Sequence, residues 1–204
     1  MKKSILYLLA ISLLGVVSCN SNKSEKNATV TSTPKTTGDE VRTINAQSDP
    51  DTLKGSVKAI ATGTTGTTTI TVNYYSPAVR GRVIWGGLVP FDNVWVTGAH
   101  KATSIEFDSK VRIGDIEVAP GKYGLFTIPG KEEWTIILNK NWDQHLADDY
   151  SQTDDIVRIK VKPETEDVNQ ERLRYVIESE TDSKGEIVIY WEKLEISLPV
   201  ESIK

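Results

Sequence analysis

A glycine-rich stretch between residues 74 and 104 gathers the side chains of this sequence that are best suited to holding a ligand. Two arginines, two tryptophans, a histidine and a lysine occur there, namely Arg80, Arg82, Trp85, Trp95, His100 and Lys101. Guanidinium groups bind carboxylates and phosphates through paired hydrogen bonds, and nearby indole rings supply stacking surfaces. Glycine lets the backbone approach a ligand closely. These six residues are therefore predicted to line a site for a small anionic or carbohydrate ligand.

The same stretch also has a packing interpretation, which the sequence leaves open. Trp85 and Trp95 could fill one end of a β domain, while Arg80 and Arg82 could bond buried carbonyls or pair with carboxylates. A long loop inside a compact β domain is usually functional or disordered, and this one is too apolar for disorder. The binding interpretation requires an open concave pocket, whereas the packing interpretation requires sealed tryptophans and partnered arginines.

Catalysis has one candidate, His100, whose imidazole could act as a general acid or base with an acidic partner near neutral pH. The alternative for His100 is a loop histidine bonded to backbone. A Ser–His–Asp arrangement is not indicated, because the sequence contains no Gly-x-Ser-x-Gly motif. The two histidines and one cysteine lack the spacing of a metal site, so we expect no metal and no cofactor.

Charged and aromatic residues outside this stretch favour solvated surfaces. Five aspartates precede a predicted strand without the spacing of an EF-hand, which indicates a solvated acidic loop: Asp143, Asp148, Asp149, Asp154 and Asp155. Five basic residues are expected on the solvated side of a sheet: Arg158, Lys160, Lys162, Arg172 and Arg174. Trp142 follows a polar run and is expected to be exposed.

The first 18 residues have the form of a bacterial lipoprotein signal. Lys2 and Lys3 precede an apolar run over residues 5–17, and Val-Val-Ser-Cys at residues 16–19 matches the cleavage pattern of lipoprotein signal peptidase. The apolar run is shorter than the ~20 residues needed to span a bilayer. Cleavage before Cys19 would leave its thiol and amine for acyl chains, and two or more chains anchor a protein durably. We therefore predict lipidation of Cys19 and attachment to a membrane.

Residues 19–52 are predicted to be the lipidated cysteine and a flexible tether, because they are rich in Ser, Thr, Asn and Lys and poor in apolar residues. Loss of Lys2 and Lys3 with the signal takes the formal charge from −4 to −6. This acidic balance argues against a nucleic-acid partner. Because no aspartate directly follows Cys19, we expect the cell envelope as the location, at the outer membrane and facing the periplasm.

Residues 53–204 are predicted to form a single β-sandwich domain. Apolar and polar residues alternate in successive short runs separated by turns that contain glycine or proline, and no run keeps a helical period. The pattern favours an all-β fold, either an antiparallel β-sandwich or a jelly-roll-like domain. Gly114-Asp115 predicts a two-residue hairpin turn. A change of apolar parity at Glu192-Lys193 predicts a β-bulge, because a one-residue slip turns every side chain to the opposite face.

A series of short motifs runs through the predicted domain. They are SPxVRGR at residues 76–82, IWGGLVP at 84–90, VW at 94–95, TGA at 97–99, GKYxLFTIPG at 121–130 and EWT at 133–135. Over about residues 53–200 these motifs resemble the domain of unknown function 2911 family. The resemblance implies a secreted or lipidated envelope protein of Bacteroidetes, and it supplies no activity that could be carried over to this chain.

The sequence as a whole favours a lipid-anchored envelope protein that acts as a non-catalytic binding or interaction module. An envelope hydrolase that uses His100 with an acidic partner is the alternative, and a purely structural envelope protein is a third interpretation. The predicted partners are a membrane, through the lipid on Cys19, and a small anionic or carbohydrate ligand.

Overall fold

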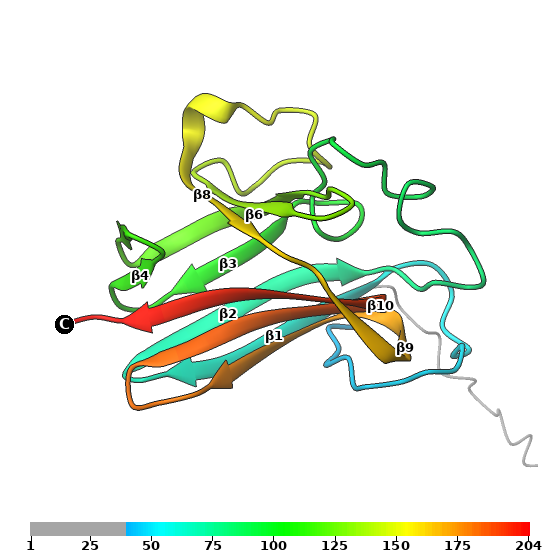
Figure 1. Ribbon diagram of the computed structural model, residues 1–204, viewed down its shortest axis with the longest axis horizontal. Coiled ribbons are helices and arrows are strands. Elements are labelled where there is room, and N and C mark those ends of the chain that lie inside the picture. The colour runs from blue at the N-terminus through cyan, green and yellow to red at the C-terminus, as the bar shows by residue number, and fades with distance from the viewer. Residues whose placement is uncertain (1–39) are drawn as a thin grey trace, which may run out of the picture. The chain divides into compact units, whose positions relative to one another are not determined.

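The computed structural model describes residues 40–204, which fold into two antiparallel β-sheets packed as a sandwich (Figure 1). The predicted all-β class is therefore confirmed. The predicted signal, Cys19 and most of the predicted tether lie outside the described residues. Within residues 40–204, no helix combines the length and the apolar character needed to cross a bilayer.

The larger sheet has the strand order β1-β2-β3-β6-β7-β8. Its strands are β1 (Val57–Thr65), β2 (Thr68–Ser76), β3 (Thr103–Phe107), β6 (Gly121–Ile128), β7 (Trp134–Asn139) and β8 (Asp155–Val161). The smaller sheet has the order β5-β4-β10-β9. Its strands are β4 (Val111–Ile113), β5 (Ile116–Val118), β9 (Glu164–Ser179) and β10 (Lys184–Ser202). A 3₁₀ turn over Gln152–Asp154 precedes β8.

The main core lies between the two sheets, where period-two alternation places the apolar side chains. Val72 and Ile105 of the larger sheet pack in one cluster with Leu173 and Ile189 of the smaller sheet, and all four are buried. Alternate residues of a strand point to opposite faces, so the polar members of these runs face outward. The hydrophobic alternation in the sequence thus identifies the inner face of each sheet.

Both predicted backbone irregularities are confirmed. β4 and β5 pair antiparallel around Gly114, whose φ of +58° is of the sign that the tight turn requires. The pairing of β10 with β9 shifts register on either side of Glu192, which itself has a φ of 57°. The bulge lets Trp191 and Ile196 both face the core although they lie an odd number of residues apart.

The outer face of the larger sheet is covered over part of its width by two connections. The linking segment, residues 77–102, joins β2 to β3, and the β7–β8 loop, residues 140–154, lies over β6 and β7 (Figure 1). Phe126 and Ile137 point into this cover and pack with Val96 and Tyr150 in a second core cluster. Beside this cover, the outer face over β1, β2 and β3 is hollowed into a groove.

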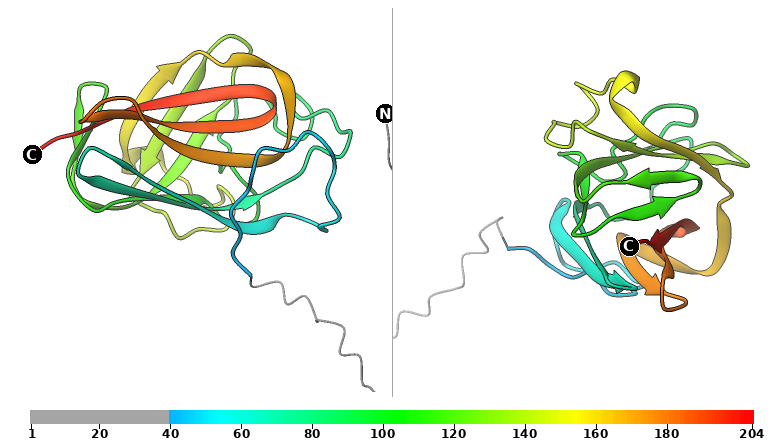
Figure 2. Two further views of the ribbon diagram at one scale, coloured as in Figure 1. Left: turned by 90° about the horizontal axis from the view of Figure 1, so that it is seen from below. Right: turned by 90° about the vertical axis from the view of Figure 1, so that its left-hand side faces the viewer.

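The described chain starts with an N-terminal strap, residues 40–55, that packs along the domain (blue in Figure 2). Arg42 forms a parallel bridge with Ala59 of β1, and Ile44 is buried in the main core. The Glu171 N–H donates to the Gln47 carbonyl at 2.8 Å. The contacts of the strap thus begin at Arg42, whereas the sequence pattern places the start of the domain at residue 53.

Candidate functional site

The linking segment brings Trp85 and Trp95 onto Trp134 of β7 and Trp191 of β10. The Trp85 ring lies edge-on to Trp134 and Trp191, with ring centroids 4.9 Å and 5.6 Å apart. Trp95 stacks on Trp191 at 5.6 Å, and its indole N–H donates to a carbonyl of its own segment. Trp134 and Trp191 are fully buried. This aromatic cluster belongs to the main core, as the packing interpretation requires.

Arg80 and Arg82 are engaged by backbone atoms. The Arg82 guanidinium donates to the carbonyls of residues 78 and 79, which lie in the same segment. The Arg80 guanidinium donates to the Leu53 carbonyl of the strap. Arg80 has a φ of 50°, and its N–H donates to the buried Glu171 carboxylate at 2.9 Å. Both arginines therefore stabilise the path of the linking segment.

The structure does not bring the six predicted site residues together on one surface. Trp85, Trp95, Arg80 and Arg82 contribute to packing, as described above. His100 is exposed and has a φ of 64°, and its ring lies edge-on to Tyr75 with centroids 5.1 Å apart. Lys101 is exposed and its Nζ lies 3.1 Å from Asp143 Oδ1. Only these last two residues lie next to the groove in the larger sheet.

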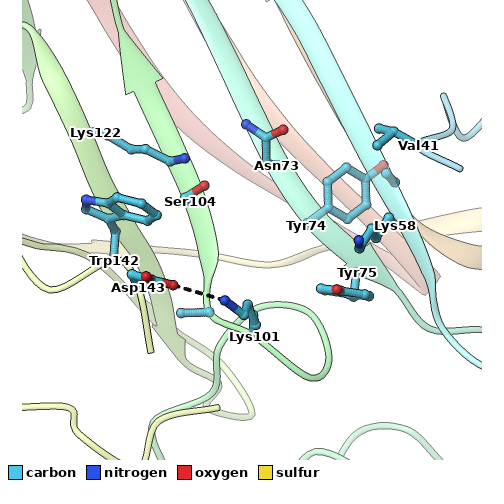
Figure 3. A pocket seen from close by; sticks show the side chains of 12 residues that line it. Val41, Lys58, Asn73, Tyr74, Tyr75, Lys101, Ser104, Lys122, Trp142 and Asp143 are labelled. Atoms are coloured by element: carbon cyan, nitrogen blue, oxygen red, sulfur yellow. Dashed lines mark hydrogen bonds and ion pairs between the residues drawn. The ribbon is translucent and has the colours of Figure 1, made fainter. Parts of the chain in front are cut away.

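The groove has a volume of about 200 Å³ and lies on the outer face of the larger sheet (Figure 3). Its floor comes from four neighbouring strands, with Lys58 of β1, Asn73 and Tyr75 of β2, Ser104 of β3 and Lys122 of β6. Lys101, Trp142 and Asp143 form its wall. Of its charged lining residues, three are lysines and one is an aspartate, so the groove is basic on an otherwise acidic protein.

Strand pairing aligns the floor of the groove. Lys58 lies opposite Tyr75, and Asn73 lies opposite Ser104. Directly opposed residues of paired strands point to the same face, so these side chains share one surface. Lys122 lies on β6, where it is opposed by Glu106 of β3, two residues along from Ser104. The floor therefore assembles from residues that are far apart in the sequence.

Trp142 is held at the groove by a glycine and a lysine. A Cβ on Gly124 would lie 3.0 Å from the Asn141 carbonyl oxygen and 3.3 Å from Trp142 Cα, so the missing side chain lets the β7–β8 loop close onto β6. Lys122 Nζ lies 4.0 Å from the Trp142 ring centroid, in a cation–π contact. Trp142 is 38% exposed, which confirms the expectation of a surface tryptophan.

The chemistry available in the groove is recognition of negative charge. Ammonium groups, the Ser104 hydroxyl and the Asn73 amide all donate hydrogen bonds, and the rings of Tyr75 and Trp142 offer apolar surface. Beneath the floor, burial raises the pKa of Tyr74 to about 12, so this phenol stays neutral at physiological pH. Figure 3 shows the lysines around a central space that Ser104 and Asn73 border.

Some carboxylates at the acidic β7–β8 loop form hydrogen bonds and ion pairs with nearby residues. Asp155 accepts hydrogen bonds from the Tyr150 hydroxyl at 2.8 Å and from Arg158 at 2.6 Å. Burial and the neighbouring Asp155 raise the pKa of Tyr150 to about 12. The second histidine, His145, pairs with Asp148 at 2.9 Å, with both side chains largely exposed. Among the residues that the structure describes, no three His, Cys, Asp or Glu side chains form a metal-binding group.

Arg172 is predicted to be solvated, and this prediction is wrong, because the N-terminal strap covers its side of β9. The side chain is fully buried and donates to both oxygens of the Asp51 carboxylate. It also donates to the carbonyls of Leu53 at 2.9 Å, Gly55 at 3.2 Å and Ser76 at 3.0 Å. All five N–H groups of the guanidinium thus have acceptors. The hydrogen bond from Arg172 is the main reason that the pKa of Asp51 is lowered.

A β-sandwich domain with a basic groove on one sheet is the class that the fold and site define. Residues 56–200 match the family described as "Protein of unknown function (DUF2911)", and the chain belongs to this family. The resemblance carried by the sequence motifs is thereby confirmed. No curated protein and no solved structure matches the chain.

Proposed function

We propose that this chain is a lipid-anchored protein of a bacterial envelope and that its β-sandwich binds a small anionic ligand in the groove. The anchoring half is supported by the sequence of residues 1–19, in which two lysines, a short apolar run and Val-Val-Ser-Cys occur in the order of a lipoprotein signal. Attachment to the outer membrane, with the domain facing the periplasm, is part of the same proposal.

The binding half is supported by one observation above all, the approach of Lys58, Lys101 and Lys122 to a single groove. Like charges repel, and the lining holds three lysines against the single carboxylate of Asp143, so the hollow favours a ligand that supplies negative charge. Trp142 and Tyr75 add ring surface for the apolar part of such a ligand. A carboxylated sugar and a phosphorylated metabolite share this chemistry.

The contacts of His100 favour binding over hydrolysis. Its ring packs against Tyr75, and the imidazole–carboxylate pair that does form joins His145 to Asp148 on the exposed loop. The groups lining the groove are suited to hold an anion, and that is the extent of the chemistry we assign to them. We therefore prefer a non-catalytic binding module to the hydrolase and to the purely structural protein.

A titration with paired sugars tests the binding proposal. We expect D-glucuronate to bind the wild-type protein and D-glucose, which lacks the carboxylate, to bind far more weakly in isothermal titration calorimetry. Lys122→Gln should weaken glucuronate binding roughly tenfold, because a hydrogen bond to a charged group is worth about 1.5–3 kcal/mol. Lys131→Gln, in the exposed turn after β6, is the matched control and should bind as wild type does.

The outcomes separate the possibilities. If the wild-type protein binds inorganic phosphate and not glucuronate, and Lys122→Gln loses phosphate binding, the groove would still be an anion site but with a different ligand. Equal affinities for the acidic and the neutral sugar, or an unchanged Lys122→Gln variant for every anion, would remove the binding proposal. For the anchor, radiolabelled palmitate should be incorporated into the wild-type chain and not into Cys19→Ser; a soluble, unlabelled wild-type protein would contradict it.

A further inference from the structure

The linking segment exposes aliphatic side chains that neither core cluster uses. Val83 is 74% exposed and Leu88 is 47% exposed, although their neighbours Ile84 and Val89 are buried in the main core. The Leu88 N–H donates to the Val83 carbonyl at 3.0 Å, so the two residues are adjacent in space. Residues 83–89 are called the knuckle below.

Backbone hydrogen bonds close the knuckle into a turn. The N–H of Gly87 donates to the Ile84 carbonyl at 3.2 Å, the N–H of Val89 donates to the same carbonyl at 2.9 Å, and the N–H of Gly86 donates to Val89 at 2.8 Å. Trp85 extends from its centre into the aromatic cluster of the core. Exposed aliphatic side chains that lie next to each other on a hydrogen-bonded turn are a candidate contact surface.

Cationic side chains adjoin the knuckle. Arg80 and Arg82 precede it and are exposed. The bond from Arg80 to the Leu53 carbonyl brings the strap alongside, and the next residue of the strap is the exposed Lys54. Aliphatic groups rimmed by basic residues are the pattern of a surface that enters the headgroup region of a bilayer.

The position of the knuckle in the domain is consistent with contact with a bilayer. The strap and the linking segment lie at one end of the sandwich, whereas the C-terminus lies at the opposite end (Figure 1). The described chain begins in the strap, so residues 20–39 lead from this end to Cys19. The tether that composition predicts for these residues would span roughly 25 Å, which would keep this end close to any membrane that holds the anchor.

We propose that the knuckle docks onto the phospholipid surface that carries the anchor, with Val83 and Leu88 entering the headgroup region and Arg80 and Arg82 facing the phosphates. This inference rests on the lipid anchoring proposed above. Two side chains offer far less area than the roughly 800 Å² per partner of a stable protein interface, which favours a lipid surface over a protein. The body of the domain is thereby oriented, with one end on the membrane.

A fluorescent probe at two positions tests this orientation. The full chain, processed in a host that acylates lipoproteins, is prepared as Val83→Cys and as Ile116→Cys, each labelled with nitrobenzoxadiazole. Ile116 is 37% exposed in the β4–β5 hairpin, which lies toward the C-terminal end (Figure 1). In vesicles of phosphatidylethanolamine with a minor fraction of phosphatidylglycerol, we expect a blue-shifted, several-fold brighter emission at residue 83 and aqueous emission at residue 116.

Each other result overturns the inference in its own way. Aqueous emission at both positions, in protein that floats with the vesicles, would leave the anchor in place and remove the docking. Shielding of residue 83 in native envelopes but not in protein-free vesicles would assign the knuckle to a protein partner instead. Protein that fails to float would remove the anchor and the docking together, which distinguishes the failure of the proposed function from that of the inference alone.

Discussion

The linking segment and the groove both contain basic and aromatic side chains, but the surroundings of these side chains differ. In the linking segment, Trp85 is packed against other tryptophans and Arg82 bonds carbonyls of its own chain. In the groove, Trp142 is exposed and Lys122 lies over its ring beside open space. A dense group of arginines and tryptophans in the sequence can therefore serve internal packing rather than a ligand site.

The backbone explains this difference. An irregular segment leaves carbonyl groups without a strand partner, and side chains with several donors, such as arginine, must satisfy them. In a sheet the carbonyls are paired along the ladder, so lysines near the outer face are not needed for that role; Lys101 pairs with Asp143, and Lys122 lies over the Trp142 ring. The arginines of the linking segment stabilise its backbone conformation, whereas the lysines of the groove lie on a sheet whose backbone is already hydrogen-bonded.

The largest expected effect concerns Arg172, which joins the strap to the start of the linking segment. Arg172→Met should lower the free energy of unfolding by about 3–5 kcal/mol, because it leaves the Asp51 carboxylate and several carbonyls without their donor. Arg174→Met, which loses only a contact over the Tyr190 ring, should cost about 1 kcal/mol or less. Urea denaturation of both variants measures this. Equal stabilities would contradict the structural role of Arg172.

The same substitution at two tryptophans sharpens the comparison directly. Trp85→Ala should destabilise the protein by about 3 kcal/mol through a cavity in the aromatic cluster, and Trp142→Ala by less than about 1 kcal/mol. The indole N–H of Trp85 is buried without an acceptor among the described residues, so Trp85→Phe should cost less than Trp85→Ala. Thermal unfolding followed by circular dichroism would show the order. A larger loss at Trp142 would break the comparison.

Substitution of Arg82 should lower stability without affecting ligand binding, and substitution of Lys122 should weaken ligand binding without affecting stability. Arg82→Ala should cost about 1–2 kcal/mol of stability through two lost hydrogen bonds, with glucuronate affinity unchanged. Lys122→Gln should leave the unfolding free energy within about 0.5 kcal/mol and weaken binding. Calorimetric titration and urea denaturation of the same two preparations give both readouts. Loss of binding in a folded Arg82→Ala protein would return the ligand site to the linking segment.

The smallest expected effect is a local response of the strap to acid. Arg172 lowers the pKa of Asp51 below its ordinary value of 3.8, so this interaction contributes stability that is fully present above about pH 4. The contribution is lost as the pH falls through the lowered pKa. Hydrogen exchange should therefore show the Ile60 N–H, which donates to the Arg42 carbonyl, losing protection before Ile136 in the core. Simultaneous loss at both sites, or the same acid response in Asp51→Asn, would contradict a strap-specific effect.

Local patterns in the sequence were sufficient for the all-β class, the β4–β5 turn and the bulge at Glu192, because each is indicated by residues that are close together in the sequence. The groove was not predictable in this way. Lys58 and Lys122 meet because β3 pairs with β6 while β4 and β5 leave for the other sheet, and alternation within a run carries no information on that choice. The outward positions of both lysines were the available signal.

Arg172 escaped prediction for a related reason. Its place in an alternating run assigns it to the outside of β9, and the strap and the end of β2, which are distant parts of the chain, turn that outside into interior. Trp142 was predicted correctly because its polar neighbours in the sequence also surround it in the structure. Sequence reasoning thus succeeded where the environment of a residue is local and failed where a remote segment creates it.

The guanidinium of Arg172 also limits how far the polypeptide can be shortened. Four of its five hydrogen bonds end on residues 51–55, yet the family match starts at residue 56. A recombinant fragment trimmed to the family boundary would lose these four hydrogen bonds and the strap that covers the Arg172 side chain. The family match therefore starts later than the part of the chain that packs with the domain. The strap before residue 56 belongs to the folded domain.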